Sequence, residues 1–197
     1  MWFGRIGGAL VIGGCALCLF ALAIVAGGGS GDSGLESALR LIESVALMPI
    51  SLGAAILAAT GPKPLSGRAL RVGLVSLALG LSCYLVATNV PVPAGSNSLQ
   101  VWPIVIGLGV GYATSLFGLV LTRLSLVRRP GQLRRAGVLL LVGLWLIPLA
   151  VLVTAWSSGG GFPLGLATGV LGLVGIFLGG IGIGVLAIRG DRSELVA

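Results

Sequence analysis

The feature that most constrains this chain is a series of six apolar runs, each close to the length of a helix that crosses a bilayer. Such a helix needs about 20 mostly apolar residues to span a hydrocarbon core of ~30 Å. The runs cover residues 6–26, 44–60, 72–90, 104–122, 136–156 and 164–188. Short segments rich in Gly, Pro, Ser or Arg separate them, as expected between antiparallel neighbours. The pattern predicts an all-α, polytopic integral membrane protein whose single domain, residues 1–197, forms six transmembrane helices.

Composition agrees with this prediction, since only 9% of the residues are charged and 56% are hydrophobic. A soluble domain carries roughly a quarter of its residues as Asp, Glu, Lys and Arg. The first run is longer than the apolar part of a secretory signal, which has about 7–15 residues, so we expect it to be retained as a span. The second run is expected to continue outward as a helix from residue 34, because Ser33 and Glu36 have the spacing of a capping box.

The basic residues predict the orientation of the helices. If the six helices alternate in direction, every one of the 12 basic residues except Arg40 falls on the same side of the membrane. Segments rich in Arg and Lys are retained on the cytoplasmic side. We therefore expect both termini in the cytoplasm and the protein in the cell membrane.

Glycine is abundant, with 35 residues, and recurs at helical spacing in the fourth and sixth runs. Small residues let helix backbones approach each other in lipid, which supplies no hydrophobic drive for helix association. We therefore expect a Gly-rich bundle in which these glycines face other helices of the same chain. A homodimer contact along the last run is the alternative. The glycines assigned to helix packing are Gly107, Gly111, Gly165, Gly169, Gly172, Gly175, Gly179 and Gly182.

The residue types that usually carry chemistry are scarce. The chain has no His, and its five carboxylates all lie outside the predicted hydrocarbon core. Proton-coupled carriers and intramembrane hydrolases place ionisable groups within that core. We therefore expect no catalytic residue, no metal ligand and no cofactor. Cys15 and Cys18 form a C-x-x-C pair in the first run, which keeps a thiol–disulfide function as an alternative, although Cys is also an ordinary small apolar residue of such helices.

Five arginines lie in or beside the segment between the fourth and fifth runs. We expect them to bind anionic lipid headgroups on the cytoplasmic face, with docking of a soluble partner as the alternative. Because the cations lie between apolar runs, nucleic acid is not an expected partner. These arginines are Arg123, Arg128, Arg129, Arg134 and Arg135.

Three aromatic residues, Tyr84, Tyr112 and Trp145, lie near the middle of the third, fourth and fifth runs. Aromatic residues of membrane helices are more often found at the membrane–water interfaces. We therefore take these three as a candidate pocket between the three helices, with packing in the bundle core as the alternative.

The residues are compatible with three classes of function. The first is a non-enzymatic membrane protein, either transporter-type or an accessory subunit of a larger complex with other membrane subunits. The second is a stand-alone channel or carrier for an uncharged or lipid-like solute. The third is a membrane enzyme that modifies lipids or acts by thiol redox chemistry. We expect the first class, because uncharged spans and short loops suit it best.

Overall fold

The computed structural model is all-helical over the residues that it describes, which are 2–27, 33–60, 65, 67–90, 98–127, 132–156 and 162–190. Six helices occur within these ranges. They are α1 (Trp2–Gly27), α2 (Ser33–Thr60), α3 (Arg68–Asn89), α4 (Ser98–Val127), α5 (Gln132–Trp156) and α6 (Phe162–Gly190). Side chains are described for 2–24, 44–60, 65, 67–90, 102–127, 134–146, 149, 168 and 170–189.

Four of these helices are long and apolar enough to cross a membrane, judged by length and composition over the described residues. The qualifying segments are Trp2–Ile24, Arg68–Asn89, Trp102–Val127 and Val170–Arg189. The apolar part of α2, Ser44–Thr60, is shorter. Four such helices in one chain suggest a membrane protein, because about 20 apolar residues per helix match the thickness of a bilayer.

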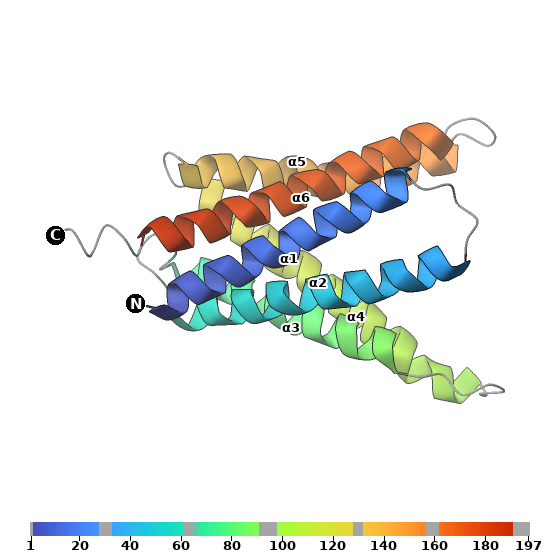
Figure 1. Cartoon of the computed structure of the whole chain (residues 1–197), viewed down its shortest axis with the longest axis horizontal. Coiled ribbons are helices and arrows are strands. Elements are labelled where there is room, and N and C mark those ends of the chain that lie inside the picture. The colour runs from blue at the N-terminus through green and yellow to red at the C-terminus, as the bar shows by residue number, and fades with distance from the viewer. Residues whose placement is uncertain are drawn as a thin grey trace.

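The helices form a bundle in which each one packs against its neighbour in sequence, and α6 also packs against α1 (Figure 1). Successive helices run in opposite directions, so the start of α1 and the end of α6 lie at the same end of the bundle (Figure 1). The end of α2, the start of α3, the end of α4 and the start of α5 lie at this end as well (Figure 1). We call it the basic end, because the described arginines Arg5, Arg68, Arg71, Arg123, Arg134, Arg135 and Arg189 all lie in the helix turns nearest to it.

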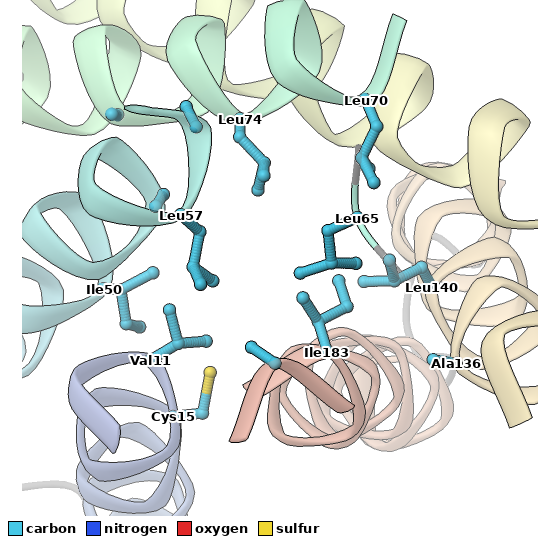
Figure 2. Close-up of a cluster of buried hydrophobic side chains, with 14 of the residues drawn as sticks. Val11, Cys15, Ile50, Leu57, Leu65, Leu70, Leu74, Ala136, Leu140 and Ile183 are labelled. Carbon is cyan, nitrogen blue, oxygen red and sulfur yellow. The ribbon is translucent and has the colours of Figure 1, made fainter. Parts of the chain in front are cut away.

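The core is densest near the basic end. Its fully buried large side chains are Leu57, Leu65, Leu70, Leu126, Leu140 and Thr122. Figure 2 shows Leu57, Leu74, Leu65 and Ile183 pointing toward a common centre from three helices and the segment between α2 and α3. The apolar side chains of this cluster are buried and gain dispersion contacts with one another. These contacts stabilise the part of the bundle near the basic end.

One polar contact links α2 to α3 inside this apolar surrounding. The Ser51 hydroxyl donates to the carbonyl oxygen of Ala78 at 3.0 Å, and its oxygen lies 2.9 Å from that of Ser82. Other hydroxyls donate to their own helix, as Thr60 does to Ile56 at 2.8 Å. A hydroxyl in an apolar medium needs such a partner, because an unpaired polar group there is costly.

Candidate functional site

Among the described glycines, those at the contact of α3 with α4 come nearest to a facing helix backbone. A Cβ placed on Gly73 would lie 2.6 Å from the Thr122 hydroxyl oxygen, and one on Gly111 would lie 2.7 Å from the backbone nitrogen of Tyr84. Gly118 meets the backbone nitrogen of Leu77 even more closely. Carbon atoms attached to these positions would overlap the opposite backbone, so only glycine permits this helix–helix distance.

The predicted packing glycines of α4 lie at this contact. Gly111 faces α3, and a Cβ on Gly107 would be 3.2 Å from the Cβ of Ala87. Sequence reasoning missed Gly73 and Gly80, which supply the α3 side of the same contact. Their spacing of seven residues, two helical turns, was the available signal.

The predicted packing glycines of α6 face α5 of the same chain over the described residues. A Cβ on Gly179 would lie 2.7 Å from Leu140, one on Gly182 3.1 Å from Ala136, and one on Gly175 3.2 Å from Gly143. Gly172 provides the carbonyl that a Cβ on Gly143 would meet at 2.6 Å. Gly165 and Gly169 belong to α6, but their surroundings lie outside the described residues.

A third close contact, between α1 and α2, had no counterpart among the predicted glycines. Gly7 lies against Gly53, and Gly14 lies against Ala46, again with a spacing of seven residues on each helix. On its other side α1 meets α6, where Gly8 faces Gly184. Helix α1 therefore packs closely against two neighbours.

The three aromatic residues of the candidate pocket differ in their exposure. Tyr84 is half-buried, whereas Tyr112 is 55% exposed and Trp145 is 68% exposed. Exposure of this size fits contact with the surrounding medium better than the lining of an enclosed pocket.

Arg123 near the end of α4 and Arg134 and Arg135 near the start of α5 lie at the basic end. Arg123 is half-buried, and its Nε atom is buried without a hydrogen-bond partner among the described residues. Arg134 and Arg135 are exposed. Arg128 and Arg129 lie outside the described residues. A buried guanidinium nitrogen is a strong donor, so it gains most from an anionic acceptor.

The cysteines are all free thiols. Cys15 and Cys18 are buried on α1, and the Cys15 sulfur packs 2.7 Å from the position of a Cβ on Gly180 of α6. Cys83 is exposed on α3. Within the described part of the chain, no group of three or more His, Cys, Asp or Glu residues is placed to hold a metal ion.

The described surfaces thus belong to a helical protein whose apolar helices suggest a membrane location. Glycines mediate close contacts between its described helices, and the arginines with described side chains lie at one end. Compared with protein-family models, with curated proteins and with solved structures, the chain matches none of them.

Proposed function

We propose that this chain is a six-span protein of the cell membrane, with both termini in the cytoplasm, that acts as a non-enzymatic subunit of a larger membrane complex. Its role there is transporter-type or accessory. The observation that carries the proposal is the core at the basic end, where Leu57, Leu65 and Leu70 are 0% exposed. A stand-alone channel needs a path along the bundle that water can fill. These leucines are buried, so they do not line such a path.

Three features support six spans. Helix α5 has 25 residues and packs along α6, which is itself long and apolar enough to cross a bilayer. Helix α2 packs between α1 and α3, which both meet the same criterion. Successive helices run in opposite directions (Figure 1). Because α2 and α5 pack along helices that are long and apolar enough to cross a bilayer, a bilayer around this bundle is most simply crossed by all six helices.

The orientation is supported by the position of the charges. The described arginines of α1, α3, α4, α5 and α6 lie at the basic end, which holds the start of α1 and the end of α6. An end of this kind is retained in the cytoplasm.

The proposal is tested by mild-detergent extraction of the tagged full-length chain from the membranes of its own cells. We expect a second membrane protein to co-purify at a constant ratio, and we expect the purified chain alone to leave liposomes impermeable to glycerol. A single pure species that makes the liposomes permeable to glycerol would replace this proposal with the stand-alone channel.

A further inference from the structure

Helices α4 and α5 meet at the basic end and then separate. A Cβ on Gly137 of α5 would lie 3.0 Å from Leu126 and 3.0 Å from Val127, in the last turn of α4. Away from that end, Figure 1 shows α4 crossing toward the side of α3 while α5 stays beside α6. Beyond Gly137, the glycine contacts of α4 are with α3, and that of Gly143 on α5 is with α6.

Helical geometry identifies the residues on the faces of α4 and α5 that meet at Gly137. On α4, Arg123 lies three and four residues before Leu126 and Val127, so it shares their face. On α5, Arg134 lies three residues before Gly137 and shares its face in the same way. Tyr112 precedes Arg123 by 11 residues and Trp145 follows Arg134 by 11 residues. Eleven residues are close to three full turns, so each aromatic side chain returns to the face of its Arg.

Among the residues with described side chains, the aromatic rings on both faces are left largely uncovered. Tyr112 is 55% exposed and Trp145 is 68% exposed. Arg134 is exposed, and the buried Nε of Arg123 has no hydrogen-bond partner within the described ranges. We call these four residues the α4–α5 face: two guanidinium groups at the basic end, and an aromatic ring on each helix farther along.

We propose that the α4–α5 face binds one anionic phospholipid. The phosphate accepts hydrogen bonds from Arg123 and Arg134, and the acyl chains lie along α4 and α5 against Tyr112 and Trp145. This inference rests on the membrane location in the proposed function.

Charge and length both favour this occupant. A guanidinium can donate two parallel hydrogen bonds to a phosphate, which is the acceptor that anionic lipids bring to the membrane surface. Eleven helical residues span about 16 Å, close to half of a ~30 Å hydrocarbon core. The arginines and the aromatic rings are therefore separated by about one lipid leaflet. An apolar helix on this face would leave both guanidinium groups unpaired.

The test uses quenching of Trp145 fluorescence in a chain carrying Trp2→Phe, Trp102→Phe and Trp156→Phe. The chain is placed in phosphatidylcholine bilayers to which phosphatidylglycerol with dibrominated acyl chains is added in small amounts. Dibrominated phosphatidylcholine at the same fraction measures contact with unselected lipid. We expect phosphatidylglycerol to quench more strongly, which reports the acyl chain at Trp145 rather than only the headgroup.

Two double variants identify the source of the selectivity. Arg123→Gln with Arg134→Gln should lower the relative affinity for phosphatidylglycerol by about fivefold for each Arg removed. Arg68→Gln with Arg71→Gln removes the same charge from exposed positions at the same end. Arg68 lies five residues and Arg71 two residues before Gly73, which faces α4. Both arginines are therefore on the side of α3 that points away from α4. The second double variant should keep the selectivity.

The Lys pair Arg123→Lys with Arg134→Lys retains both charges and should keep most of the preference, which guards against loss of the fold as the cause. Equal quenching by the two lipids overturns the proposal. Equal loss in both Gln pairs also overturns it and indicates diffuse charge attraction. If neither lipid quenches Trp145, another helix covers the α4–α5 face, and the proposal is overturned as well. If the purified chain makes liposomes permeable to glycerol but still prefers phosphatidylglycerol, the proposed subunit role is refuted and the lipid site is not. The two proposals therefore fail separately.

Discussion

At the scale of single residues, glycine determines how closely the helices approach. Gly109 and Gly118 are both glycines of α4 and lie nine residues apart. A Cβ on Gly118 would overlap the backbone of Leu77, whereas nothing lies within 4 Å of a Cβ on Gly109. The same residue type is therefore required at one position and replaceable at the other, and the difference is set by the opposing helix.

Gly118→Ala should lower the free energy of unfolding by about 1–3 kcal/mol, because α3 and α4 must move apart to admit the methyl group. Gly109→Ala should leave it unchanged or raise it by up to about 1 kcal/mol, because Ala favours the helix over Gly. Unfolding in mixed detergent micelles, followed by circular dichroism, measures both. Equal losses in the two variants would show that α3 and α4 do not pack this closely.

At the scale of helices, three glycines of α6 lie at its close contact with α5. Gly175, Gly179 and Gly182 recur at intervals of four and three residues and meet Gly143, Leu140 and Ala136. These three glycines therefore lie against α5 of the same chain, and the assignment of the whole face to packing stays a prediction. A second copy would have to displace α5 to contact these glycines.

Gly172→Leu with Gly179→Leu should prevent formation of the folded bundle. The Leu at position 179 adds three carbons beyond a Cβ position that already lies 2.7 Å from Leu140, and the one at position 172 is added where the backbone of α6 lies against Gly143. The matched control is Gly13→Leu with Gly109→Leu, since neither position has an atom within 4 Å of a Cβ. Size-exclusion chromatography and circular dichroism in detergent separate the outcomes. If the first pair only converts an oligomer to folded monomers, the glycines form a contact between copies instead.

At the scale of the whole molecule, the ends of the bundle differ in charge. The arginines with described side chains lie at the basic end, and α3 connects that end to the other through 22 residues. Ala69 lies in its first turn, and Val90 directly follows its last residue. Both are exposed, so a single helix offers one reporter position at each end.

With Cys15, Cys18 and Cys83 replaced by Ala, a membrane-impermeant maleimide should label Val90→Cys on intact cells. Ala69→Cys should be labelled only after the membrane is opened, because the basic end is expected in the cytoplasm. The reversed pattern would invert the orientation, and labelling of both sites on intact cells would contradict a crossing by α3.

Several elements followed from the sequence because their causes are local. Apolar runs bounded by Gly, Pro, Ser and Arg indicated helices, and the chain is all-helical in its described parts, with four helices suited to crossing a membrane. Helix α4 begins at Ser98 and ends at Val127, beyond both ends of the run 104–122. Hydrophobicity marks the apolar length of a helix and not the polar turns that extend it.

Other features depended on contacts between distant segments. Sequence reasoning did not find Gly73 and Gly80, because their importance comes from residues of α4 more than 30 positions away. It took Tyr84, Tyr112 and Trp145 as a candidate pocket but gave no information on their exposure, and the structure shows Tyr112 and Trp145 exposed. Burial of an aromatic residue in the middle of a helix depends on the distance between the axes of two helices. The positions of residues along one helix do not determine that distance.

The sequence by itself therefore determined the helical elements, their apolar character and the gathering of arginines in alternate segments. These follow from hydropathy, turn residues and charge along the chain. Only the tertiary structure decided which glycines meet a backbone, that Leu65 closes the core at the basic end, and that α4 leaves α5 beyond Gly137. Those outcomes depend on the angles and distances between helices, which arise from the packing of many side chains at once.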